Sequence, residues 1–188
     1  MSELFLQISV SLDGYIDDAQ QSIEWMAGDT SVDSLHTATL QSIDGMIFGR
    51  KAHALLAEFW PDAGQSRDAS PALIEQAQLM NALPKYVLTR GEEDTGWANS
   101  HAIRLNDIPG LKENARRPIA LFAGATAAQQ ALMQGFLDEI RLIQYPVVLG
   151  AGTPLFEDNG ERYALILVES RSFDSGATLN RYRVRQES

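Results

Sequence analysis

Short apolar runs and segments of helical periodicity alternate along the chain. Apolar runs typical of buried strands occupy residues 4–10, 46–48, 86–89, 101–105 and 119–122. Longer predicted strands follow at 138–148, 164–173 and 177–185, and a hairpin-like turn at 174–176 joins the last two. Apolar positions spaced by three or four residues predict helices at about 32–43, at 50–59, from 71 onward and at about 127–135.

Capping residues mark the expected starts of two of these helices. Thr30 and Ser31 precede the first helix and are candidate caps, and Ser70 followed by Pro71 opens the third. The segment 15–29 between the first strand and the first helix is polar and irregular. Any residues in it that face a ligand are therefore hard to identify from the pattern.

The order of these elements predicts the fold class. Strands alternate with helices through most of the chain, and two antiparallel strands end it. This order is typical of an α/β three-layer fold, with a mostly parallel central sheet, an antiparallel C-terminal edge and flanking helices. No repeat, low-complexity tract or linker interrupts it, so we expect a single domain over residues 1–188.

Composition narrows the possible functions. Among 188 residues, 45% are hydrophobic and 21% charged, as in a soluble globular protein. Cysteine is absent, which excludes disulfides and thiolate catalysis, and three scattered histidines predict no metal site. The net charge of −10 argues against nucleic-acid or anionic-membrane binding. Without a signal-like N-terminus or a membrane-length apolar run, we expect a cytoplasmic protein.

A turn of small residues follows the predicted strand 119–122. It consists of Ala123, Gly124, Ala125 and Thr126. Thr126 and Gln129 have the spacing of a capping box at the start of the next helix. Such a turn lets backbone N–H groups and the helix dipole face a phosphate, although an ordinary strand-to-helix turn has the same composition.

Two further strand ends carry cationic residues. Gly49, Arg50 and Lys51 follow the strand 46–48, and Thr89 with Arg90 ends the strand 86–89. Ligands of open α/β sheets bind at the carboxyl ends of the strands, and guanidinium groups suit phosphate. Each cation alone could be a solvated surface charge. Together with the turn at Gly124, they indicate a ligand with several phosphates, such as a dinucleotide.

Two other turns are ambiguous. Asp13 ends the first strand, where a carboxylate could orient a polar heterocycle or pass a proton. Asp13 followed by Gly14 is equally common turn chemistry. Gly150 and Gly152 look like half of a dinucleotide fingerprint, but Pro154 follows and no helix is predicted there. We interpret that segment as a turn that lines the edge of a site.

Six segments spread over nearly the whole chain form an ordered set. They are residues 8–16, 44–51, 84–90, 123–126, 136–141 and 146–156. In sequence and order they resemble the dihydrofolate reductase-like family, which includes the C-terminal reductase domain of the bifunctional riboflavin-biosynthesis deaminase-reductase. Stand-alone members of that family are the most similar.

The resemblance implies a mostly parallel sheet of about eight strands, NADPH as cofactor and a homodimer. By the same resemblance, Gly49, Arg50, Lys51, Thr89 and Arg90 would hold the phosphates on the adenosine side. The turn from Ala123 to Thr126 would hold the pyrophosphate. The region from Asp13 to Ile16 would lie beside the nicotinamide.

The chain departs from dihydrofolate reductases proper near the substrate. Their Leu-Pro-Trp motif is replaced by residues 23–26, and Asp29 or Asp33 is a loose counterpart of their pterin-binding acid. We therefore predict an NADPH-dependent reductase that acts on a small heterocyclic substrate, pterin-like or pyrimidine-riboside-like, rather than on folate. The alternative is a nucleotide-binding or sensor module without catalysis. Binding with and without cofactor oxidation separates the two.

Overall fold

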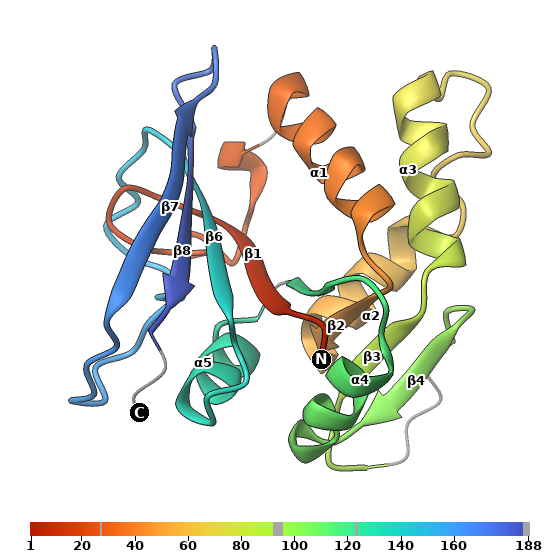
Figure 1. Cartoon of the computed structure of the whole chain (residues 1–188). Helices are drawn as coiled ribbons and strands as arrows, with labels where there is room; N and C mark the ends of the chain where they lie inside the picture. Colours follow the sequence, from red (N-terminus) through yellow and green to blue (C-terminus); the bar gives the residue numbers. More distant parts are fainter. Residues whose placement is uncertain (27, 92–95, 123, 186–188) are drawn as a thin grey trace.

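Eight strands form one mixed sheet at the centre of the structure (Figure 1). The computed structural model describes residues 1–26, 28–91, 96–122 and 124–185. The strands are β1 Leu4–Val10, β2 Gly45–Gly49, β3 Lys85–Leu88, β4 Ser100–Ile103, β5 Ile119–Phe122, β6 Glu139–Gln144, β7 Leu165–Ser172 and β8 Thr178–Val184. Their order across the sheet is β4-β3-β2-β5-β1-β6-β8-β7.

The first six strands are parallel, and the C-terminal hairpin closes the sheet in antiparallel fashion. β8 pairs antiparallel with β6, and β7 pairs antiparallel with β8. β1 lies between β5 and β6. After β1 the chain forms β2, β3 and β4 in turn toward one margin of the sheet. It then forms β5 between β2 and β1, and β6 on the other side of β1. The carboxyl ends of all six parallel strands consequently meet at one edge.

Helices cover both faces of the sheet, which confirms the predicted three-layer α/β fold. They are α1 Thr30–Ser42, α2 Arg50–Phe59, α3 Pro71–Ala82, α4 Ile108–Asn114 and α5 Ala125–Met133, with 3-10 turns η1 Glu24–Met26 and η2 Leu105–Asp107. Side chains of α1, α2 and α3 pack with Phe5, Met46 and Phe48 on one face. Those of α4 and α5 pack with Leu4 and Leu6 on the other. Residues on both faces of β1 are therefore buried, as expected for parallel strands between helical layers.

The predicted caps of the first helix, Thr30 and Ser31, are wrong. Asp29, rather than Thr30 or Ser31, caps α1, because its carboxylate accepts hydrogen bonds from the Ser31 and Val32 amides at 3.1 Å. Aspartate, serine and threonine all suit a cap, so the local sequence leaves the start of the helix open by a residue or two.

The predicted capping box at the start of α5 is also wrong. α5 begins at Ala125 behind Gly124, and no side chain caps it. Gln129 Nε2 instead donates to the Leu155 carbonyl oxygen at 3.0 Å, which ties α5 to the loop after β6. The Gln129 side chain, which the local pattern assigned to the helix start, thus forms a long-range hydrogen bond instead.

Two further elements differ from expectation. β6 ends at Gln144, whereas the apolar run predicted a strand to residue 148, because the chain from Tyr145 onward leaves the sheet. α4 was not predicted, since Pro109 and Gly110 near its start weaken the helical pattern. Its Ile108 is nevertheless fully buried against the sheet.

Candidate functional site

Four neighbouring strands carry the predicted site residues at their carboxyl ends. In their order along the sheet edge these strands are β3, β2, β5 and β1. The described residues at or after these ends are Thr89 and Arg90, then Gly49, Arg50 and Lys51, then Gly124, Ala125 and Thr126, then Asp13 and Ile16. Ala123, also predicted at this site, lies outside the described residues. Residues that the sequence separates by more than one hundred positions thus share one edge.

The starts of α2 and α5 meet at two glycines. Gly124 has φ of +95°, a conformation that glycine adopts without the cost other residues incur. A Cβ atom added there would lie 4.0 Å from Gly49 Cα and 3.8 Å from Ala127 Cβ. Neither glycine has a side chain that could cap its helix. The two turns therefore approach each other through their backbone atoms.

Backbone donors remain at the start of α5. Among the described residues, the hydrogen bonds of the helix begin with that from the Ala128 amide to the Gly124 carbonyl, at 3.0 Å. The amides of Ala125, Thr126 and Ala127 precede that bond and have no partner within the helix. Donors of this kind, with the positive end of the helix dipole, form a site for a phosphate or carboxylate.

Cationic residues lie at the carboxyl ends of the two strands next along the same sheet edge, β2 and β3. Arg50 and Lys51 are exposed at the first turn of α2, and Arg90 is exposed just after β3. Thr89 fixes the end of β3, because its amide donates to the Ile103 carbonyl at 3.1 Å and its Oγ1 accepts from the Gly91 amide at 3.2 Å. The edge therefore combines backbone donors with positive charge, which suits an anion with several phosphates.

Asp13 joins two loops at the end of β1. Its carboxylate accepts hydrogen bonds from Ser11 Oγ at 2.7 Å, from the Leu149 amide at 3.1 Å and from the Gly150 amide at 2.8 Å. These bonds, led by that from Ser11, lower the pKa of Asp13 to about 2. These three hydrogen bonds fit the turn interpretation of Asp13. Its catalytic role stays a prediction.

Replacing Asp13 with asparagine is expected to lower the free energy of unfolding at neutral pH, because an amide cannot accept all three hydrogen bonds. The pKa of Asp13 is lower in the folded protein than the ordinary 3.8. Its contribution is therefore present above about pH 4 and is lost as the pH falls toward 2. Denaturant unfolding of both proteins should show a stability difference at pH 7 that shrinks at pH 3. An equal difference at both values would contradict this role.

The loop after β6 is fastened to the segment that contains Ile16. The Ile16 amide donates to the Thr153 carbonyl at 2.9 Å, and the Leu155 amide donates to the Gly14 carbonyl at 2.9 Å. Asp17 accepts from both the amide and the hydroxyl of Thr153, at 2.7 and 3.0 Å. Sequence reasoning missed Asp17, since its partner is 136 residues away and no local spacing connects the two.

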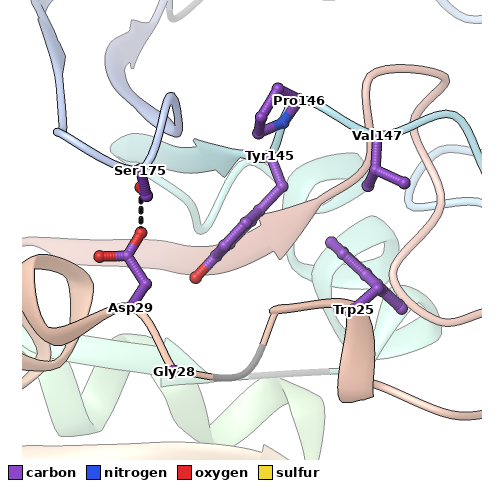
Figure 2. A pocket seen from close by; sticks show the side chains of 7 residues that line it. All are labelled: Trp25, Gly28, Asp29, Tyr145, Pro146, Val147 and Ser175. Carbon is purple, nitrogen blue, oxygen red and sulfur yellow. Dashed lines mark hydrogen bonds between the residues drawn. The ribbon is translucent and has the colours of Figure 1, made fainter.

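A cavity of about 250 Å³ lies beyond the end of β6 (Figure 2). Its lining residues are Trp25, Gly28, Asp29, Tyr145, Pro146, Val147 and Ser175. Trp25 and Tyr145 meet edge to face with ring centroids 5.6 Å apart, and Ser175 Oγ donates to the Asp29 carboxylate. The Val147 carbonyl accepts from the Leu12 amide at 2.8 Å, so the cavity adjoins the loop after β1.

Tyr145, which lines this cavity, has a hydroxyl that is less acidic than that of an ordinary tyrosine. Burial and the nearby Asp29 and Asp33 carboxylates raise the pKa of Tyr145 to about 12, and its hydroxyl donates to the Met26 carbonyl at 3.3 Å. The cavity therefore presents neutral aromatic surface beside a carboxylate already engaged by a serine. Such walls suit a flat, uncharged ring.

The part of the chain that the structure describes shows neither a metal-binding cluster nor a membrane-spanning helix. Among the described residues, no cluster of three or more histidine, aspartate or glutamate side chains is arranged to hold a metal ion. No helix in the described ranges has both the length and the apolar character needed to cross a bilayer.

Known proteins share this sequence pattern and fold. Residues 2–179 match the family described as the RibD C-terminal domain. The uncharacterized protein YyaP of Bacillus subtilis is 33% identical over 178 residues, which cover 92% of this chain and 90% of YyaP.

Two solved structures illustrate the fold. A putative riboflavin biosynthesis protein from Shewanella sp. PV-4 superposes with a TM-score of 0.74 at 20% identity, covering 98% of this chain and 99% of the other. Dihydrofolate reductase from Enterococcus faecalis, solved in complex with NADP(H) and RAB-propyl, superposes with a TM-score of 0.61 at 10% identity, covering 98% of this chain and 97% of the other. The chain therefore belongs to the RibD C-terminal domain family and has the dihydrofolate reductase-like fold.

Proposed function

We propose that the protein is an NADPH-dependent reductase that transfers hydride to a small heterocyclic substrate, pterin-like or pyrimidine-riboside-like. The contact between the Gly49 and Gly124 turns carries the proposal, because it brings two helix N-termini together beside cationic strand ends. The Enterococcus faecalis enzyme with this fold, solved with NADP(H), supports the choice of dinucleotide.

The residues present fit such a cofactor. In this proposal the turn from Ala123 to Thr126 holds the pyrophosphate through its amides. Arg50, Lys51, Thr89 and Arg90 hold the phosphates on the adenosine side. Ile16, on the segment fastened to the loop after β6, lies beside the nicotinamide.

Bound NADPH would supply the hydride, and the chain would position the reactants around it. The Trp25 and Tyr145 rings would hold a flat substrate in the adjoining cavity. In this proposal the proton reaches the substrate through Asp13, at the end of β1, or through ordered water. The loops that Asp13 and Asp17 join would limit access of bulk water to the site.

Replacing Arg90 with alanine tests the assignment of the cofactor. NADPH should bind the wild-type protein with micromolar or tighter affinity at low salt. The variant should lose about tenfold or more in affinity for NADPH, or about 1.4 kcal/mol, with little change for NADH, because a guanidinium recognises the additional phosphate. Fluorescence titration with both nucleotides measures this.

The matched control is Arg162→Ala, which removes an exposed arginine distant in sequence from the predicted site. It should change neither affinity. Equal losses for NADPH and NADH in Arg90→Ala would contradict the phosphate assignment, and absence of NADPH binding to the wild type would overturn the proposed function.

A nucleotide-binding module without turnover is the second candidate, favoured by the engagement of Asp13 in structural hydrogen bonds. NADPH oxidation in the presence of pterins, pyrimidine ribosides and quinones distinguishes the two. Turnover with any of them supports the reductase. Tight NADPH binding without oxidation across the panel would favour the binding module.

A further inference from the structure

The cavity beyond β6 has a carboxylate on one side, that of Asp29 (Figure 2). Among the described residues that line it, Asp29 is the acidic one and none is basic. Asp29 is only 9% exposed. A carboxylate beside a cavity is a strong acceptor for the N–H groups of a ring, above all for cationic ones. Its use by a ligand depends on which acceptor positions the protein already fills.

The start of α1 fills one oxygen of this carboxylate. Asp29 Oδ1 accepts hydrogen bonds from the Ser31 and Val32 amides, each at 3.1 Å. A carboxylate oxygen offers about two acceptor positions, so these two amides saturate Oδ1. A group with two parallel N–H donors, such as an amidine, needs a free position on each oxygen. The helix cap therefore leaves Oδ2 as the oxygen that a ligand could use.

The turn between β7 and β8 supplies a partner to that second oxygen. Ser175 Oγ donates to Asp29 Oδ2 across 146 positions of sequence, as the dashed line in Figure 2 marks. The same Oγ accepts from the Ala177 amide at 3.3 Å, which orients the hydroxyl. A Cβ atom added at Gly176 would lie 3.3 Å from Pro146 Cγ, so the turn packs against another residue that lines the cavity.

The aromatic residues of the cavity use their polar atoms elsewhere. Trp25 Nε1 donates to the Ser22 carbonyl at 3.2 Å, and the Tyr145 hydroxyl donates to the Met26 carbonyl at 3.3 Å. Both side chains consequently offer a ligand their ring surfaces rather than free donors. A ring in this cavity is held mainly by packing, unless the Asp29 carboxylate becomes available.

We propose that Ser175 is a specificity-determining residue of this cavity. By holding Asp29 Oδ2, it closes the cavity to flat rings that bind through cationic N–H donors, such as amidines. Neutral rings, which pack against Trp25 and Tyr145 without such donors, remain the ligands of the cavity. The inference rests on the proposed function in that it takes this cavity as the place of the substrate ring.

Replacing Ser175 with alanine tests the proposal, because it frees an acceptor position on Asp29 Oδ2. The variant should bind benzamidine, a flat ring with a cationic amidine, about tenfold more tightly than the wild type, equivalent to about 1.4 kcal/mol. Benzamide, a neutral ring of similar shape, should bind both proteins equally. Isothermal titration calorimetry without NADPH measures each affinity. Ser175 is exposed in a turn, so the variant should fold.

Three further variants locate the effect. Ser170→Ala is the matched control, since it removes an exposed serine of the same hairpin whose Oγ donates to Asn180 Oδ1 at 2.7 Å, and it should bind benzamidine as the wild type does. Ser175→Thr keeps the hydroxyl and should keep the wild-type affinity. Asn is also a good helix cap, so Asp29→Asn combined with Ser175→Ala should fold and lose the gain with the charge.

Each outcome decides the proposal. It is overturned if Ser175→Ala shows no gain in benzamidine affinity, or if benzamide gains equally, because the variant would then only enlarge the cavity. A gain that persists with Asp29→Asn, or that appears in Ser170→Ala, would place the effect outside the Ser175–Asp29 pair and also overturn it. These titrations contain no NADPH, so a failure of NADPH binding would overturn the proposed function and leave their result intact.

Discussion

Replacing Gly152 with alanine is expected to displace the loop after β6 and lower the free energy of unfolding by more than about 2 kcal/mol. Gly152 has φ of +142°, and a Cβ atom there would lie 1.9 Å from the Asp17 carbonyl oxygen and 2.9 Å from its carbonyl carbon. Both are backbone atoms, so no change of rotamer relieves the overlap. The two segments would have to separate, breaking the bonds between Asp17 and Thr153.

Gly150→Ala is the matched control two residues earlier. Gly150 has φ of +74°, but nothing lies within 4 Å of an added Cβ atom. Only backbone strain of about 1 kcal/mol is expected there. Chemical denaturation of both variants should therefore give clearly unequal losses. Similar losses would mean that the close approach of Asp17 to Gly152 does not hold the loop.

Replacing Gly124 with valine is expected to weaken NADPH binding by about a hundredfold, equivalent to about 2.7 kcal/mol. The backbone at φ of +95° is unfavourable for a β-branched residue, and the side chain would project between the Gly124 and Gly49 turns. It would occupy the space where the proposed pyrophosphate approaches the amides of α5. Titration of the variant with NADPH measures the loss.

Gly135→Val provides the control at the opposite end of α5. Gly135 also has a positive φ, +68°, and an added Cβ atom meets nothing within 4 Å. The variant should lose stability through backbone strain while retaining wild-type affinity for NADPH. If both variants lost affinity equally, general destabilisation of α5 would explain the effect, and the assignment of the Gly124 turn would be contradicted.

The strand ends of the site could be predicted because their strands are buried on both faces. Such strands appear in the sequence as continuous apolar runs, and the runs at 46–48, 86–89 and 119–122 correspond to β2, β3 and β5 within one or two residues. The residues after each run then lie at the carboxyl edge of a parallel sheet. This general property of parallel sheets predicted where ligand-binding residues should gather.

Local patterns failed where a distant contact decided the structure. The spacing of Thr126 and Gln129 suggested a capping box, but Gln129 is bonded to Leu155. The apolar residues after Gln144 suggested a longer strand, but the Leu12 amide binds the Val147 carbonyl and Asp13 binds the Leu149 and Gly150 amides. Apolar periodicity reports which residues are buried and does not identify what buries them.

The sequence by itself determined the order of strands and helices, the α/β class, the family and the small-residue turn at Gly124. Only the tertiary structure decided that Gly49 lies close to Gly124, that Asp13 binds the loop at Gly150, and that the apolar run of β7 is exposed at the margin of the sheet. These facts depend on the insertion of β1 between β5 and β6 and on the outer position of β7. Strand order arises from contacts between distant segments, and local hydrophobic periodicity does not contain it.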